Sequence, residues 1–522
     1  MAAGIETQTA LQFLKANTLP ILLVAIVLRL LYNKFKPGLA SIPGPPLAAW
    51  TGFWFFLKVR RGQAHLLSID LHHKYGPLVR INPNKVSVGD AKEIRNIYGL
   101  NKGFTKTAFY PIQSIIYKRQ PQVNLFATRD EAYHRHMKRA VANSYSMTAL
   151  LDKEDSVDTC IRIFMEKLGE FSERDEAVDL GVWLQLYAFD VVGEFSFGTR
   201  LGFLEKGQDV DGMMETICGL LAYSAQVGQL PEWHHVLLGN PLLRILLPSM
   251  ETWNEITNFT LRAVDSVNSL ISDSKGGHST KEKQKLLNAR TDMLSRWTAL
   301  ELGSPEKINT RDIIVHLSTN VLAGSDTTAI ALRAILYYLL RTPPKLAKLI
   351  AQIDAADAAG VLSNPITYRE ATTHLPYLDA VIKEGMRMHP SVGLILEREV
   401  PSGGATICGR HIPGGTIVGV NPWVTGYDSR IFPEPHAFIP ERWLESSLEA
   451  LREMEQAWFG FGAGSRTCLG KNISIIEMSK VVPQLLREFE VRFDRPDREW
   501  RVNNQWFTQQ EGFVVGLKKR VA

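Results

Sequence analysis

The chain has 522 residues, of which 45% are hydrophobic and 22% are charged, and this composition excludes disordered, collagen-like and low-complexity proteins. Lysine and arginine (59) exceed aspartate and glutamate (54) by only five, so no nucleic-acid partner is expected. The four cysteines are too few for a disulfide scaffold, and none forms a CxxC pair typical of zinc sites. We therefore expect a reducing compartment in which at most one cysteine has a chemical role.

The N-terminal segment is strongly apolar. Residues 19–32 read L-P-I-L-L-V-A-I-V-L-R-L-L-Y, in which Arg29 is the only charged residue. Because a membrane-spanning helix needs about 20 residues, the span has to begin near Leu11, with Lys15 and Arg29 reaching toward opposite interfaces. Basic residues follow the apolar run, which favours a cytosolic position for the bulk of the chain.

We expect residues 1–40 to form an N-terminal anchor and linker, with a single transmembrane helix at about 11–32. A helix that lies on the membrane surface and a cleaved signal peptide are the alternative interpretations. The signal peptide has less support, because no basic region precedes the apolar run and no small-x-small site closes it.

A proline-rich joint precedes a long folded region. We expect the sequence I-P-G-P-P at residues 42–46 to be non-helical, because proline fixes its own φ and pushes the preceding residue toward extended geometry. Residues 41–522 contain no internal repeat and no linker long enough to separate two domains. We therefore expect one large domain after the anchor.

The domain is predicted to be mainly α with a minor β component. Residues 79–88 and 405–420 have the pattern of short β-hairpins around proline and glycine turns. The polar stretch at residues 272–284 is predicted to be a loop, and most of the remaining chain has helical periodicity.

The longest predicted helix covers residues 309–341, with Asn309 or Thr310 as its cap and Pro343 as its stop. Its middle reads A-G-S-D-T-T at residues 323–328, and glycine next to acid and hydroxyl groups is a poor choice for helix stability. A threonine hydroxyl can donate to the carbonyl four residues earlier and bend the helix, which opens room beside it. By itself the fragment is also compatible with an ordinary helix irregularity.

A second motif, Glu384-x-x-Arg387, lies on a helix predicted from about Pro376 to His389. An acid and a base three residues apart more often form a solvated surface pair. The motif gains weight from P-E-R-W at residues 440–443, because its Arg442 comes shortly before the glycine-rich cysteine loop described next.

The sharpest motif is F-G-F-G-A-G-S-R-T-C-L-G at residues 459–470, followed by an apolar helix in which Pro483 is expected to cause a kink or an end. Glycines allow a tight backbone whose N–H groups point at the sulfur, and the start of a helix adds positive potential, so Cys468 is expected as a thiolate. A thiolate that ligates haem iron favours O–O cleavage, and Arg466 can pair with a haem propionate. A buried structural cysteine is the alternative interpretation of this loop on its own.

The spacing Phe461-x-x-Gly464-x-Arg466-x-Cys468-x-Gly470 resembles the signature of the cytochrome P-450 superfamily of haem-thiolate monooxygenases. The resemblance extends over nearly the whole chain, from the proline-rich joint to the C-terminal loop. It implies the cytochrome P-450 fold for residues 41–522, with haem b (iron protoporphyrin IX) as cofactor. It also implies that Cys468 is the axial iron ligand and that Arg466 and Phe461 contact the haem.

The same resemblance implies roles for two groups in other helices. Asp326 and Thr327 match the acid–alcohol pair that supplies protons to bound dioxygen. Glu384, Arg387 and Arg442 match the residues that hold the cysteine loop in register, which is a structural role.

Further haem contacts are implied at two places. Arg398, in a strand-like stretch, matches a family propionate ligand. Relatives commonly carry Trp-x-x-x-Arg in an upstream basic helix, where this chain has His134-x-x-x-Lys138. Both side chains can donate to a propionate, although lysine does so without the bidentate fork of arginine. A solvated basic face is the alternative interpretation of this helix.

As an activity, the resemblance implies insertion of one oxygen atom from O2 into a hydrophobic small molecule by hydroxylation, epoxidation or demethylation. Electrons are expected from NADPH through a separate NADPH–cytochrome reductase, with cytochrome b5 as an optional second donor, since no reductase-sized segment with a dinucleotide fingerprint is present. The expected location is the endoplasmic reticulum membrane, with the catalytic domain on the cytosolic side.

Residues 101–147 and 320–343 are most similar to the pisatin demethylase branch of fungal microsomal enzymes, which favours a role in secondary-metabolite biosynthesis. The alternatives are a haem-thiolate isomerase or dehydratase without oxygen activation and a non-enzymatic haem protein. Neither needs a proton-delivery pair, so Asp326 and Thr327 argue against both.

Overall fold

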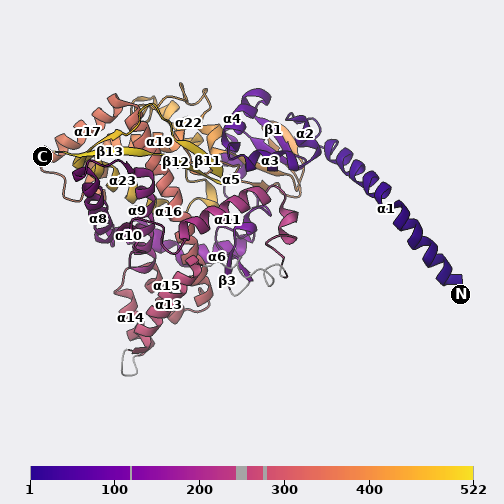
Figure 1. Cartoon of the computed structure of the whole chain (residues 1–522), viewed down its shortest axis with the longest axis horizontal. Helices are drawn as coiled ribbons and strands as arrows, with labels where there is room; N and C mark the ends of the chain where they lie inside the picture. Colours follow the sequence, from indigo (N-terminus) through magenta and orange to yellow (C-terminus); the bar gives the residue numbers. More distant parts are fainter. Residues whose placement is uncertain (1, 118–119, 241, 243–254, 274–278, 521–522) are drawn as a thin grey trace.

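The computed structural model describes residues 2–117, 120–240, 242, 255–273 and 279–520, and for residues 2–17 it describes the backbone alone. The described part is mainly helical with a small sheet component, as predicted (Figure 1).

The helices of the first half are α1 (Ala2–Lys34), α2 (Pro46–Trp50), α3 (Phe53–Arg60), α4 (Ala64–Tyr75), α5 (Glu93–Tyr98), η1 (Tyr110–Gln113), α6 (Glu131–Val141), η2 (Ala142–Tyr145), α7 (Met147–Leu151), α8 (Glu154–Glu173), α9 (Leu180–Phe197), α10 (Phe203–Lys206), α11 (Met213–Val227), η3 (Pro231–His235) and α13 (Glu255–Asp273). Those of the second half are α14 (Thr280–Asn288), α15 (Met293–Gly303), α16 (Thr310–Arg341), α17 (Pro343–Ala358), α18 (Tyr368–His374), α19 (Pro376–Met388), α20 (Pro422–Gly426), α21 (Arg442–Glu445), α22 (Leu448–Ala457), η5 (Gly464–Arg466) and α23 (Lys471–Glu488). The strands are β1 (Leu78–Asn82), β2 (Lys85–Val88), β3 (Ile115–Tyr117), β4 (Gln120–Gln122), β5 (Val178–Asp179), β6 (Arg398–Glu399), β7 (Ala405–Ile407), β8 (Arg410–Ile412), β9 (Ile417–Val420), β10 (Phe489–Phe493), β11 (Arg501–Gln505), β12 (Phe507–Glu511) and β13 (Val514–Lys519).

Helix α16 is the central element and has the bounds that the sequence predicts. Asn309 and Asp312 form a capping box at its start, and α17 begins with Pro343 directly after its last residues. The helix packs against α9, α13, α15, α19 and α23, and most of its side chains are buried. Gly324 allows the contact with α9, because a Cβ there would lie 2.8 Å from a methyl group of Val192. Packing thus offsets the low helix propensity of this glycine.

The main sheet has the strand order β1-β2-β9-β6. The predicted hairpin at residues 79–88 is confirmed as the antiparallel pair β1 and β2, and the run at 405–420 begins with the hairpin of β7 and β8. Strand β9, at the end of that run, instead pairs parallel with β2 and antiparallel with β6. A local pattern cannot specify this pairing, because the partner strand β2 lies more than 300 residues earlier.

Two local predictions are corrected. The polar stretch at 272–284 is only partly a loop: Ser279 caps α14, so residues 280–284 are helical, while 274–278 lie outside the described residues. Helix α23 does not end at Pro483 but continues to Glu488. Nearly all of its side chains from Ile473 onward are buried, and this packing outweighs the hydrogen bond that the proline cannot donate.

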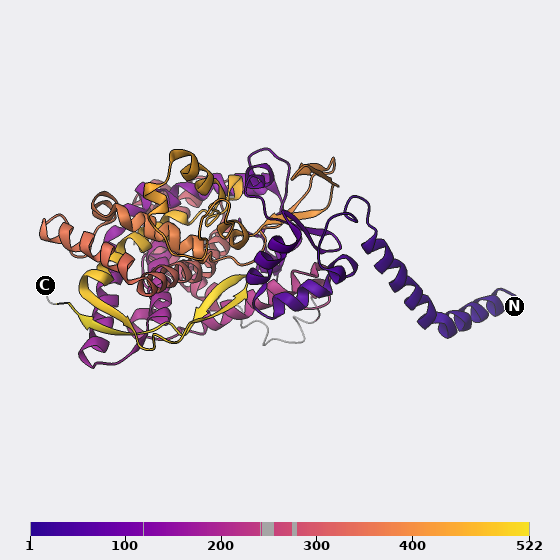
Figure 2. The same ribbon diagram turned by 90° about the horizontal axis from the view of Figure 1, so that it is seen from above.

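Helix α1 extends away from the rest of the molecule in both views (Figures 1 and 2). It contains Pro20, and its large apolar side chains from Leu19 to Tyr32 are exposed except for the half-buried Leu30. Among the residues whose side chains are described, no helix combines the length and the apolar character needed to cross a membrane. The span predicted at about 11–32 falls partly on residues 11–17, whose side chains lie outside that set.

Candidate active site

The glycine-rich loop before α23 places Cys468 at the start of that helix. Gly464 has a φ of +69°, and a Cβ there would lie 1.7 Å from the carbonyl oxygen of Tyr98, so only glycine fits this position. The backbone N–H of Cys468 donates to the carbonyl of Phe461 at 2.9 Å and closes the loop. The glycine spacing found in the sequence therefore has a steric cause.

The Cys468 side chain is accessible to solvent. Protein nevertheless surrounds it closely enough that desolvation raises the pKa of its thiol. The backbone N–H groups of Gly470 and Lys471, together with the Lys471 charge, oppose this shift but do not reverse it. The thiolate expected at Cys468 therefore stays a prediction. Metal coordination deprotonates a thiol outright, so a bound iron would supply the missing stabilisation.

Tyr145 connects the cysteine loop to the middle of α16. Its hydroxyl donates to Asn320 Oδ1 at 2.6 Å, one turn before Ala323, and its backbone carbonyl accepts from Asn472 of α23. Burial and, less strongly, the nearby Cys468 raise the pKa of the tyrosine hydroxyl. Ala323 is exposed in the middle of an otherwise largely buried helix. Sequence reasoning missed Tyr145, because no local motif marks it.

Four basic side chains and one histidine lie close together beside the cysteine loop. The predicted propionate contacts Arg398, Arg466, His134 and Lys138 are brought together, and Lys106 joins them. Burial, and after it the four neighbouring positive charges, lower the pKa of His134 to about 3. Burial, and then Arg398 and Arg466, also hold the pKa of Lys106 well below its usual range. Lys106 was missed because it lies outside any motif.

Protein groups satisfy these cations mainly through neutral oxygens. Lys138 Nζ donates to the carbonyl of Ser465 at 2.8 Å, and Arg398 donates to the hydroxyl of Tyr110 at 3.1 Å. Among the ion pairs of the described residues, the pair of Arg466 with Glu131 at 2.7 Å is the one that involves this cluster. Positive charge thus exceeds negative charge beside an accessible thiol, and this donor set fits a haem with its two propionates.

The two candidate proton-delivery residues of α16 have different surroundings. Thr327 Oγ1 donates to the carbonyl of Ala323 at 2.7 Å, which confirms the predicted bond to the residue four positions earlier. Asp326 is buried and accepts hydrogen bonds from Gln185 of α9 at 2.5 Å and Gln509 of β12 at 3.0 Å. Burial raises the pKa of Asp326 to about 6, so this carboxyl can exchange a proton near neutral pH.

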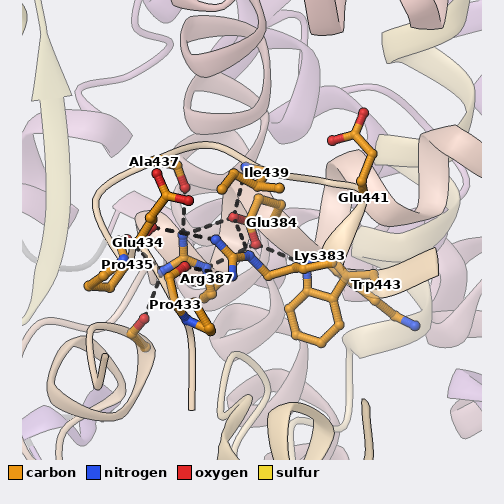
Figure 3. A network of polar contacts seen from close by, with 12 residues as sticks. Lys383, Glu384, Arg387, Pro433, Glu434, Pro435, Ala437, Ile439, Glu441 and Trp443 are labelled. Atoms are coloured by element: carbon orange, nitrogen blue, oxygen red, sulfur yellow. Dashed lines mark hydrogen bonds and ion pairs between the residues drawn. The ribbon is translucent and has the colours of Figure 1, made fainter. Parts of the chain in front are cut away.

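The structure brings the predicted structural residues into one network (Figure 3). Glu384 Oε1 accepts from Arg387 at 2.9 Å and from Arg442 at 3.0 Å, and its Oε2 accepts from Arg387 Nε at 2.9 Å. Ile439 N–H and Trp443 Nε1 also donate to this carboxylate, and Trp443 was not predicted as a partner. Glu384 and Arg387 therefore do not form a solvated surface pair, because both side chains and that of Arg442 are buried.

The network reaches the cysteine loop through Trp458. Its indole N–H donates to the carbonyl of Lys383 in α19, and its ring lies 5.7 Å from that of Phe461, centroid to centroid. Phe461 in turn accepts the hydrogen bond from Cys468. Phe461 therefore contacts the loop and its support, and its expected contact with haem stays a prediction.

Comparison with known proteins agrees with this arrangement. The family model for cytochrome P-450 matches residues 43–518. A cytochrome P-450 monooxygenase of Aspergillus terreus is 41% identical over 479 residues, which covers 90% of this chain and 95% of the relative. The cytochrome P-450 monooxygenase cicH of Emericella nidulans is 37% identical over 508 residues (95% and 99%), and a pisatin demethylase of Fusarium vanettenii is 34% identical over 505 residues (96% and 95%). The chain thus belongs to the cytochrome P-450 family and is a haem monooxygenase.

Proposed function

We propose that the chain binds haem b through Cys468 and inserts one oxygen atom from O2 into a hydrophobic small molecule of fungal secondary metabolism. The observation that carries this proposal is the accessible Cys468 thiol beside a cluster of positive side chains. Bound haem would supply the oxygen-activating redox chemistry, which no protein side chain provides.

The chain's own residues would hold the cofactor and move protons. Arg398, Arg466, His134 and Lys138 would donate to the propionates, with Lys106 as a further donor. Asp326 would exchange protons near neutral pH. The half-buried Thr327 hydroxyl, whose own hydrogen is donated to the Ala323 carbonyl, would accept a hydrogen bond from a water that carries the proton. Glu384, Arg387 and Arg442 would keep the cysteine loop in place through Trp458.

The relatives support the proposed role in secondary metabolism. They include pisatin demethylases and the monooxygenase cicH, all from fungi. We extend a secondary-metabolic role to this chain on that basis. The reducing electrons would come from NADPH through a separate reductase, with cytochrome b5 as an optional second donor.

Residues 1–40 would form the membrane anchor and linker, and residues 41–522 the catalytic domain on the cytosolic side of the endoplasmic reticulum. The exposed apolar side chains of residues 19–32 on the projecting helix α1 support this part of the proposal. A truncated protein that begins at Ser41 is expected to leave the membrane pellet and keep its haem spectrum. Retention of the truncated protein in the pellet would contradict an anchor confined to α1.

The central experiment compares two cysteine variants. Cys468→Ala is expected to lose the red-shifted Soret band of the reduced carbon monoxide complex and all monooxygenase activity, because the thiolate ligand is gone. Cys408→Ala, in the turn between β7 and β8, is the matched control and should keep both. An unchanged carbon monoxide spectrum in Cys468→Ala would overturn the proposal. Label from isotopically marked O2 in the product separates a monooxygenase from an isomerase or dehydratase.

A further inference from the structure

The carboxyl group of Asp326 is held by two amide side chains that come from distant parts of the chain. Gln185 Nε2, on α9, donates to Asp326 Oδ1 at 2.5 Å, and Gln509 Nε2, on β12, donates to Oδ2 at 3.0 Å. Asp326 and Gln185 are buried, and Gln509 is half-buried. Each carboxyl oxygen therefore has one neutral donor in a direction that a separate element fixes.

A buried arginine lies next in this chain of contacts. Arg333 Nη2 donates to Gln185 Oε1 at 2.7 Å, and its Nε donates to the carbonyl of Gly181 at 2.8 Å. The amide of Gln185 thus stands between the guanidinium of Arg333 and the carboxyl of Asp326. A direct ion pair with arginine typically lowers the pKa of an aspartate by about one to three units. The amide preserves a weaker attraction across a longer distance.

Few other charges face this carboxyl. Asp209, which precedes α11, acts on it at longer range and raises its pKa, whereas Arg333 lowers it. Cys218, on α11, faces the same group and lies 3.6 Å from the amide of Gln509. Burial is the largest influence on Asp326, and the two amide donors oppose it.

We infer that Gln185 and Gln509 are positioning residues that hold the Asp326 carboxyl away from a direct ion pair, so that it can gain and lose a proton during turnover. This inference rests on the proposed role of Asp326 in proton delivery. A carboxyl in direct contact with arginine would stay ionised, whereas one with no donors would stay protonated. With two neutral amide donors, the carboxyl of Asp326 lies between these two cases and can change its protonation state.

The test uses Gln509→Leu in the haem-loaded protein with its reductase. Loss of one donor to the ionised carboxyl should raise the pKa of Asp326 by about one pH unit, since one unit corresponds to the strength of one such hydrogen bond. The pH midpoint of product formed per NADPH consumed should therefore move about one pH unit toward alkaline pH. Gln509→Glu, which replaces the donor by an acidic group of the same size, should move the midpoint further.

Gln510→Leu is the matched control. Gln510 is the neighbouring residue and donates to α16 as well, but to the backbone carbonyl of Ile330 at 3.0 Å. Its replacement should leave the pH midpoint unchanged, even if stability falls. Gln185→Leu should shift the midpoint in the same direction as Gln509→Leu and also lower the unfolding temperature, because it leaves the buried Arg333 Nη2 without its acceptor.

A second measurement separates the inference from the proposed function. Infrared spectra of the resting protein, with the Asp326→Asn spectrum subtracted, report the titration of this one carboxyl without turnover. An infrared midpoint that stays unmoved in Gln509→Leu and Gln509→Glu, or that moves equally in Gln510→Leu, overturns the inference. An infrared midpoint that moves while the coupling midpoint stays fixed supports the positioning role and overturns proton delivery by Asp326.

Discussion

Glu384 in α19 and Asp326 in α16 are both fully enclosed carboxylates, yet their partners differ in kind. Glu384 accepts hydrogen bonds from two arginines, an indole and a backbone N–H, all between 2.9 and 3.0 Å. Asp326 accepts from two neutral amides, and its nearest arginine is separated from it by one of them. Glu384 thus has positively charged partners, whereas Asp326 has neutral ones, and burial raises the pKa of Asp326 to about 6.

The comparison distinguishes a carboxylate that supports the structure from a carboxyl group that suits proton transfer. A buried carboxylate that pairs with two arginines is costly to separate from them, and this property suits the fixed geometry behind the cysteine loop. A carboxyl with neutral donors costs less to protonate, and this property suits proton transfer. Burial alone does not distinguish the two roles, because both side chains are inaccessible.

The largest effect is expected for Glu384→Gln. This change leaves Arg387 and Arg442 without their counter-charge, and breaking a buried pair in this way costs about 3–5 kcal/mol of unfolding free energy. Denaturant unfolding measures the loss. Glu511→Gln is the control, because Glu511 pairs with Arg501 at the same 2.9 Å but on the surface, where the cost is below about 1 kcal/mol. Equal losses of unfolding free energy in the two variants would show that burial does not make this ion pair more costly to break.

Asp326→Asn is expected to change both stability and coupling. The native carboxyl holds its proton up to about pH 6, whereas the unfolded chain releases it near 3.8, so native stability falls as pH rises through this window. The fall amounts to about 3 kcal/mol, and the variant should lack it in unfolding curves recorded at several pH values. Product per NADPH should drop on the order of tenfold to a thousandfold. A variant that retains the native pH slope would show that Asp326 does not titrate as described.

Trp443→Phe probes how much a neutral donor adds to a carboxylate that already has two arginines. It removes the 2.9 Å hydrogen bond to Glu384 Oε2 and keeps most of the ring. The expected loss is about 2 kcal/mol of unfolding free energy, typical of a hydrogen bond to a charged group. A loss near zero would mean that the arginines alone satisfy the carboxylate.

Thr327→Ala is expected to have the smallest effect on free energy. Haem binding and the substrate-induced spectral change should persist, while product per NADPH falls on the order of tenfold and hydrogen peroxide rises, because a positioned hydroxyl is lost. Ser325→Ala is the control: Ser325 makes the same 2.7 Å bond to the carbonyl four residues earlier but is buried on another face of α16. If both variants keep native coupling, the oxygen site has been assigned to the wrong place.

Several features could be predicted from the sequence because their causes are local. The bounds of α16 follow from Asn309 at one end and Pro343 at the other, and the glycines of the cysteine loop follow from backbone conformations that other residues rarely adopt. Glu384 and Arg387 lie one helical turn apart, so their pairing also follows from spacing. Pro483, by contrast, does not end α23, because burial of this helix outweighs a local helix-breaking tendency, and the alternative of a kink stays a prediction.

The chemistry of the individual groups can be inferred from the sequence: a cysteine in a glycine loop, an acid beside an alcohol in a long helix, and an acid–base pair on another helix. Which of these groups meet depends on how the chain folds. Gln185 and Gln509 reach Asp326 from 141 and 183 residues away, and Lys106 joins Arg466 from the opposite end of the chain. The physical reason is that the charge state of a buried group depends on its neighbours in space, and spacing along the chain specifies these only within a few residues.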